Sequence, residues 1–184
     1  MEGMEAYVLE SYGGPEVLRR KEIPRPQPQG EEVRVKVRAV GINRADLLQR
    51  RGRYPAPGEK PPHEVPGLEF AGVVEAAGEA AGPYLKELGL LLGSPVMGLL
   101  SGSAYAQFVV THFRLLHPLP QKLSFAQGSA LPEAYLTAWE ALFQGGFSLG
   151  RAVLIPAGGS GVGVAATQLV KAGGGLAITL SRSP

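Results

Sequence analysis

The chain has 184 residues, of which 45% are hydrophobic and 18% charged, and its formal net charge is +2. These values are typical of a globular protein and leave room for one domain or two small ones. The chain has no cysteine, which excludes disulfides and thiolate metal ligands, and its 3 histidines lack metal-ligand spacing, so no metal is expected. The basic residues are scattered apart from Arg50, Arg51 and Arg53, so a nucleic-acid partner is not expected.

The sequence offers no segment suited to a membrane or to secretion. Residues 1–9 include 2 glutamates and no long apolar stretch. The longest apolar run, at 88–100, is broken by glycine, serine and proline and falls short of the roughly 20 residues that span a bilayer. We therefore expect a cytoplasmic protein with no membrane partner.

Up to about residue 120, the sequence predicts short strands separated by proline- and glycine-rich turns, a pattern typical of a compact β-barrel. Val33, Val35 and Val37 alternate with basic residues, which indicates a strand with one buried face. A glycine inside a later strand, Gly72, predicts a bulge or a close backbone approach. The expected strands lie at 6–10, 18–23, 33–38, 67–77, 96–99, 104–110 and 115–119.

One short helix is expected between these strands, beginning after Asn43 and ending near Arg50. Asn43 suits the N-cap position, and Asp46 follows in the first turn, where an acid is favoured by the helix dipole. The segment 54–66 is rich in proline and glycine and predicts a loop.

After about residue 120, the pattern changes to helices and buried strands. Val153–Ile155 predicts a parallel strand buried on both faces, and a second strand is expected at 176–180. A Rossmann half has the order β-α-β-α-β and only β-α-β is present here, so we expect the chain to end inside its second domain. Helices are expected at 124–130, 135–143 and 161–171, and the second of these carries an apolar stripe that favours core packing, formed by Leu136, Trp139, Leu142 and Phe143.

A glycine cluster after Ile155 predicts a turn that binds a dinucleotide diphosphate. Gly158 permits the turn, Gly161 leaves room for the diphosphate, and Gly163 lets the following helix lie close to the strand. The free N–H groups at the start of that helix would face the phosphates. The spacing is G-x-x-G-x-G rather than G-x-G-x-x-G, and in a chain with 26 glycines the alternative is an ordinary loop.

Four motifs follow one another along the chain, at 41–46 with Tyr54, 66–72, 131–139 and 158–163. Together they resemble the zinc-free quinone oxidoreductases of the medium-chain dehydrogenase/reductase superfamily, in the branch of zeta-crystallin and the tumour-suppressor-induced quinone oxidoreductase. Asn43 and Leu68 stand where zinc-dependent relatives carry a cysteine and a catalytic histidine. The resemblance implies a mixed β and α/β fold, with a GroES-like β-barrel domain over 1–122 and an incomplete Rossmann domain over 123–184.

The resemblance also implies a reaction, the NADPH-dependent reduction of a quinone. It places Asn43, Asp46 and Tyr54 near the nicotinamide and the substrate, and Thr137 near the nicotinamide. Asn43 would bond the cofactor ribose or the substrate carbonyl. The same residues have simpler interpretations, with Asn43 as a helix cap, Asp46 as a first-turn acid and Tyr54 as a partly exposed packing residue. The cofactor-binding loop would contribute Gly158, Ser160, Gly161, Val162 and Gly163.

The residues after the second parallel strand favour NADPH over NADH. An NAD site places an acid there to bond the ribose 2′-hydroxyl, whereas this chain has Ser181 and Arg182. Arg182 could pair with a 2′-phosphate. The alternative is a disordered terminal arginine.

Two other functions stay open from the sequence. The same barrel and hydride geometry would serve an enoyl or alkenal reductase. Alternatively, the chain is a shortened, weak or inactive form that acts only by binding, because half a Rossmann sheet would hold the nicotinamide poorly. The homodimer contact of the family is expected to lie in the part of that domain that this chain lacks.

Overall fold

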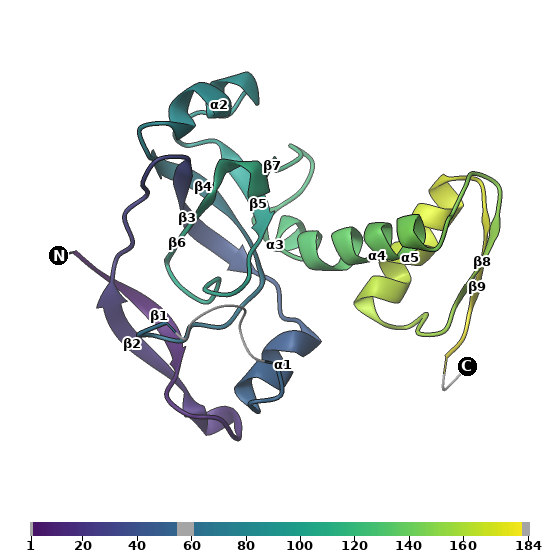
Figure 1. Cartoon of the computed structure of the whole chain (residues 1–184), viewed down its shortest axis with the longest axis horizontal. Helices are drawn as coiled ribbons and strands as arrows, with labels where there is room; N and C mark the ends of the chain where they lie inside the picture. Colours follow the sequence, from purple (N-terminus) through teal and green to yellow (C-terminus); the bar gives the residue numbers. More distant parts are fainter. Residues whose placement is uncertain (1, 55–60, 182–184) are drawn as a thin grey trace. The chain divides into compact units, whose positions relative to one another are not determined.

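The structure is a computed structural model that describes residues 2–54 and 61–181 (Figure 1). The chain divides into two compact units, Met1–Ala130 and Leu131–Pro184, and each is described by itself. The division falls beyond the boundary after residue 122 that the sequence suggested. The reason is that the short helix α3, Phe125–Gly128, packs against strands β3 and β4 of the first unit.

The first unit is a β unit of short strands, as the sequence predicted, and these strands form two antiparallel sheets. A hairpin of two strands pairs along its full length, and a single bridge from Ala6 to Ala106 joins it to the chain before β6. The larger sheet has five strands in the order β6-β3-β4-β5-β7. The strands are β1 Gly3–Leu9, β2 Leu18–Pro24, β3 Glu32–Val40, β4 Glu69–Ala77, β5 Pro95–Leu99, β6 Phe108–His112 and β7 Leu116–Pro118.

Short helices connect these strands. The expected helix after Asn43 is confirmed as α1, and α2 lies between β4 and β5. The helices of this unit are α1 Arg44–Arg50, α2 Ala81–Glu87 and α3, with 3-10 turns η1 Pro15–Val17 and η2 Phe113–Leu115.

Apolar side chains from β3, β4 and β5 form the core of the first unit. Val33 and Val35 are completely buried, and they pack with Phe70, Val74 and Val96. Burying such side chains is the main favourable contribution to folding. The register of β3 therefore follows the alternation seen in the sequence.

Gly72 brings two strands close together, as its position in β4 predicted. A Cβ atom at Gly72 would collide with the carbonyl oxygen of Lys36 on β3. The register of the β3–β4 pair also shifts between Val37 and Ala39, opposite this glycine. The absence of a side chain at Gly72 thus permits the irregular pairing at the end of β3 that leads to Asn43.

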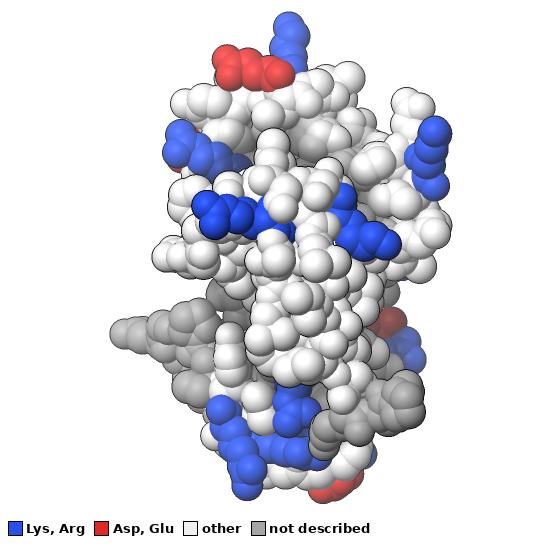
Figure 2. Space-filling model, turned by 90° about the vertical axis from the view of Figure 1, so that its right-hand side faces the viewer, with Lys and Arg blue, Asp and Glu red and all other residues white. Residues whose placement is uncertain are grey.

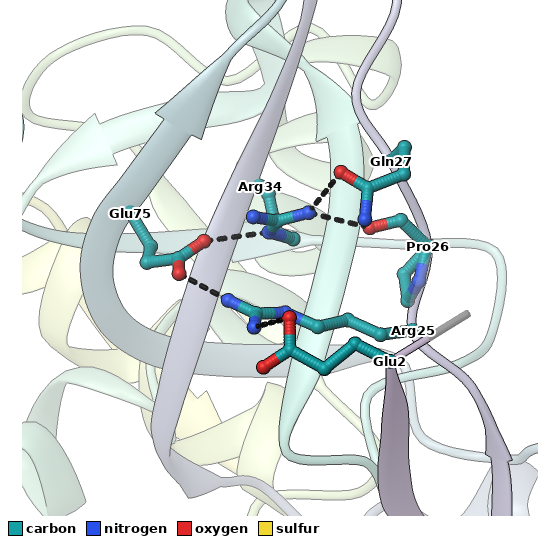
Figure 3. Close-up of polar contacts among 6 residues, drawn as sticks. All are labelled: Glu2, Arg25, Pro26, Gln27, Arg34 and Glu75. Carbon is teal, nitrogen blue, oxygen red and sulfur yellow. Dashed lines mark hydrogen bonds and ion pairs between the residues drawn. The ribbon is translucent and has the colours of Figure 1, made fainter.

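One prediction for β3 is wrong, because Arg34 is also buried. Its Nε donates to Glu75 Oε2 over 2.6 Å, and its Nη1 donates to the carbonyl of Pro26 and to Gln27 Oε1 (Figure 3). A buried guanidinium is tolerated when its donors are satisfied in this way. The charge pattern alone could not reveal these partners, which come from β4 and from the connector before β3.

Glu75 is shared between two arginines. Arg25 also bonds the Glu75 carboxylate, pairs with Glu2 over 2.7 Å and places its guanidinium 4.0 Å from the ring centre of Phe108. Burial opposes ionisation of Glu75, but the hydrogen bonds from Arg34 and Arg25 outweigh it and hold the pKa of that carboxyl below its ordinary value. The network fastens the connector after β2 to the central sheet (Figure 3).

The second unit has the expected strand–helix–strand order. Its two strands are parallel, with Ile155 opposite Thr179, and both long helices lie on one side of them (Figure 1). Its core combines Ala138, Ile155 and Ala165. The elements are α4 Pro132–Gln144, β8 Ala152–Ile155, α5 Gly161–Ala172 and β9 Leu176–Thr179.

The apolar stripe predicted on α4 is mostly not buried. Trp139 and Phe143 are 59% and 69% exposed, Leu136 is also exposed, and only Leu142 joins the core. Helix α4 instead packs against α5 through the small side chain of Ala138. The number of large apolar residues on the helix therefore suggested the wrong buried face.

The expectation that β8 is buried on both faces is also wrong. Leu154 is 58% exposed, whereas Ile155 beside it is buried. The two described helices that pack in this unit cover one face of the sheet, so side chains that point to the other face meet no helix among residues 131–181.

Candidate cofactor and substrate site

The glycine cluster forms a turn between β8 and α5. Ser160 is the N-cap of α5, and its Oγ accepts a hydrogen bond of 3.0 Å from the Gly163 N–H. The same hydroxyl donates to the carbonyl of Ala157 over 2.8 Å. One side chain thus fixes both ends of the turn and satisfies one of the free N–H groups at the helix start.

The glycines of this turn have different surroundings. A side chain at Gly163 would collide with the carbonyl of Ala157, and one at Gly158 would collide with Thr179 on β9. At Gly161, in contrast, the only neighbour of an added Cβ within 4 Å is Ala134, at 3.9 Å. Gly163 and Gly158 are therefore needed for packing, whereas Gly161 leaves open space in front of the helix.

These features fit a phosphate group. The first N–H groups of α5 and the positive end of its dipole favour an anion, and Gly161 leaves room for one to approach. Val162 is half-buried beside them and Ser160 is exposed. That this turn binds the diphosphate of a cofactor stays a prediction.

A second cluster surrounds Asn43 at the start of α1. Asn43 and Asp46 form a capping box, in which the Asn43 N–H donates to Asp46 Oδ2 over 2.7 Å. The hydroxyl of Tyr105 donates to the same oxygen over 2.9 Å. Asp46 is buried, and among the described residues its other oxygen has no hydrogen-bond partner. Asp46 thus holds the backbone of Asn43 in place.

Glu69 holds the side chain of Asn43. The Asn43 Nδ2 donates to Glu69 Oε1 over 2.8 Å, and Glu69 is buried at the start of β4. Its carboxylate lies where a side chain at Gly41 would be, so a larger residue there would displace it. The turn 41–43 is therefore shaped around the Glu69 carboxylate.

Tyr105 stays a neutral hydrogen-bond donor in this cluster. Burial raises the pKa of its hydroxyl far above the ordinary value, and the charges of Asp46 and Glu69, with the bond to Asp46, raise it further. Sequence reasoning did not identify Tyr105 or the contact between Glu69 and Asn43. No pattern around Tyr105 signals its role, because the contact joins residues 59 positions apart.

Tyr54 and Thr137 are not part of these two clusters. Tyr54 is 45% exposed and lies just before the segment 55–60, of which nothing is described. Thr137 is exposed on α4 in the second unit, as is Ser181 after β9, and Arg182 lies outside the described residues. The structure thus joins Asn43 to Asp46 and Ser160 to Gly163, and leaves the other candidates as predictions.

An apolar groove lies beside the Asn43 cluster in the first unit. It has a volume of about 480 Å³ and is lined by β1, β2, the end of β3, and Tyr105. Ile42, which precedes Asn43, is 78% exposed and also lines it. A groove of this size and polarity is suited to a small organic molecule.

Three further observations concern metal ligands, membrane-spanning helices and surface charge. Among the residues that the structure describes, no group of three or more histidines, aspartates and glutamates is arranged to hold a metal ion. None of the described helices is both long and apolar enough to cross a bilayer. On the face shown in Figure 2, lysine and arginine side chains stand in several separate groups with uncharged surface between them.

Several known proteins are similar to this chain in both sequence and fold. Residues 29–121 match the alcohol dehydrogenase GroES-like domain. Human quinone oxidoreductase is 35% identical over 175 residues, which make up 93% of this chain and 50% of that protein. The crystal structure of human synaptic vesicle membrane protein VAT-1 homolog-like protein is 32% identical, with a TM-score of 0.87 over 99% of this chain and 57% of that one.

A third similar protein was solved alone and with a cofactor. The quinone oxidoreductase of Thermus thermophilus, whose structures include a complex with NADPH, has a TM-score of 0.77 at 33% identity, over 96% of this chain and 52% of that one. The chain spans between 38% and 50% of the length of the curated relatives it matches. On its GroES-like domain and these similarities, the chain belongs to the quinone oxidoreductase-like proteins of the medium-chain dehydrogenase/reductase superfamily.

Proposed function

We propose that this chain carries the barrel domain and the phosphate-binding turn of a cytoplasmic, zinc-free, NADPH-dependent quinone reductase. The observation that supports this most strongly is the turn after β8, where Ser160 caps α5 and Gly161 leaves its first N–H groups accessible. A similar protein, the quinone oxidoreductase of Thermus thermophilus, forms a complex with NADPH. The small-molecule acceptor would be a quinone.

Each cluster would have a separate task in this reaction. NADPH supplies the hydride when it is bound, and the protein supplies binding, orientation and a dry site. The N–H groups of α5 would hold the diphosphate, with Ser160 and Val162 beside it. Asn43, kept rigid by Asp46, would orient the ribose or the acceptor. Tyr54 and Thr137 would complete the surroundings of the nicotinamide.

The preference for NADPH over NADH would come from the residues after β9. Ser181 follows this strand where an NAD site has an acid, and its neighbour Arg182 would pair with the 2′-phosphate. Because a carboxylate would repel that phosphate, the sequence at this point favours the phosphorylated cofactor.

A substitution at Gly161 tests the proposed function. We expect Gly161→Val to weaken NADPH binding at least tenfold, because the side chain would occupy the approach to the helix N-terminus. The control is Gly82→Val on α2, where an added Cβ meets no described atom within 4 Å and, as at Gly161, is free of steric conflict. Binding is measured by NADPH fluorescence with the 184-residue chain.

The outcomes of this titration separate the alternatives. Equal NADPH affinity in Gly161→Val and the parent would contradict the assignment of the turn. We expect the parent chain to bind NADPH weakly, and submicromolar binding would contradict that expectation. Oxidation of NADPH with 1,4-benzoquinone, and separately with an alkenal, identifies the acceptor class. Faster turnover of the alkenal would favour an enoyl or alkenal reductase instead.

A further inference from the structure

The side-chain amide of Asn43 has only one favourable orientation. Its Nδ2 donates to Glu69 Oε1 over 2.8 Å. An ionised carboxylate can only accept hydrogen bonds, so turning the amide over would bring the carbonyl oxygen of Asn43 against it. Because Glu69 is buried, water cannot readily replace the lost donor, and the reversed orientation is strongly disfavoured.

The backbone around this amide is held as firmly as the amide itself. The Asn43 N–H bonds the Asp46 carboxylate, which Tyr105 holds from the other side. Glu69 in turn occupies the space beside Gly41, two residues before Asn43. The position and the rotation of the Asn43 side chain are thus fixed by two buried carboxylates, from α1 and from β4.

The fixed amide has a definite polarity toward a ligand. The carbonyl oxygen of Asn43 has two lone pairs, and its capping-box contact with the start of α1 takes at most one of them, so at least one is left for another donor. We infer that Glu69 is a positioning residue, which keeps Asn43 Oδ1 turned to the ligand as an acceptor and so selects a hydroxyl group. On the proposed function, on which this inference rests, that group is a ribose hydroxyl of NADPH rather than the carbonyl of the quinone.

A swap of the two side chains tests this polarity. Asn43→Asp alone places two carboxylates together. Glu69→Gln alone puts opposite Asn43 a side chain that can either accept or donate, so both orientations of the Asn43 amide become satisfied. The double variant Asn43→Asp/Glu69→Gln rebuilds the hydrogen bond in the reverse direction and still offers an oxygen to the ligand. We expect Asn43→Asp to weaken NADPH binding about tenfold, Glu69→Gln to weaken it about two- to threefold because part of the population is reversed, and the double variant to bind within about threefold of the parent.

The control uses the same substitution on the same strand. Glu75→Gln removes a partly buried carboxylate of β4 that contacts Arg34 and Arg25 instead of Asn43. We expect its NADPH affinity to equal that of the parent. A double variant that binds no better than Asn43→Asp would overturn the assignment of Oδ1, because the ligand would then depend on the second N–H of Asn43.

NMR of the ligand-free chain separates this inference from the proposed function. We expect one Asn43 side-chain amide proton to be shifted downfield by the Glu69 carboxylate, and the shift to be lost in Glu69→Gln but kept in Glu75→Gln. An unchanged Asn43 resonance in Glu69→Gln would overturn the positioning role. If that shift is present but the parent binds no NADPH, the positioning holds while the choice of ligand and the proposed function fail.

Discussion

At the scale of single residues, buried carboxylates do most of the positioning. Asp46 and Glu69 hold Asn43, and Glu75 joins two arginines that are both mostly buried. Sequence reasoning placed Asn43 at the N-cap and Asp46 in the first turn, because these are local helix-start positions, but it did not predict the hydrogen bond between them. The partners of Glu69 and Glu75 could not be predicted, because they depend on which strands become neighbours.

The arginine–glutamate network leads to a prediction about pH. Glu75 is 30% exposed, so we expect Glu75→Gln to lower the free energy of unfolding by about 1–2 kcal/mol at neutral pH, less than for a fully buried pair. The folded-state pKa of Glu75 lies below its ordinary 4.5. Its stabilising effect is therefore complete above pH 4.5 and disappears as the pH falls through the folded-state value.

Urea unfolding of the parent and of Glu75→Gln at a series of pH values measures this effect. The difference between the two proteins should be constant near neutral pH and shrink under acid conditions. A difference that grows as the pH falls would show that Glu75 is protonated in the folded chain.

At the scale of helices and strands, hydrophobic periodicity predicted where the elements lie better than it predicted which of their faces are buried. The strands of the first unit follow alternation and turn residues closely. On α4, however, the large apolar residues suggested a core stripe, whereas Ala138 provides the close contact with α5. A small residue lets two helices approach, and the sequence does not reveal which face of a helix meets a neighbour.

Paired substitutions on α4 test this correction. We expect Leu142→Ala to lower the free energy of unfolding by about 2–4 kcal/mol, because it empties a buried position. Trp139→Ala, although it removes more atoms, should change that free energy by less than about 0.5 kcal/mol, since the side chain is mostly exposed. Thermal and urea unfolding provide the comparison. A larger loss for Trp139→Ala would mean that the original stripe is buried in solution.

At the scale of the whole molecule, the sequence predicted the order of the two units and most of their elements. The glycine motif predicted the turn and the helix that follow β8, because the apolar run, the glycine cluster and the helical run lie within one short stretch of sequence. The two compact units divide after Ala130, eight residues beyond the expected boundary, because α3 packs on the first unit. Composition changes at this helix, but packing decides to which unit it belongs.

The most direct test of the account is an NADPH titration of the chain followed by backbone amide NMR. The central claim is that the amides just after β8 bind a diphosphate. We predict saturable shifts that are largest for the N–H groups of Ser160, Gly161 and Val162, with smaller shifts at Asn43. Saturable binding that leaves the amides of 158–163 unmoved would contradict the claim.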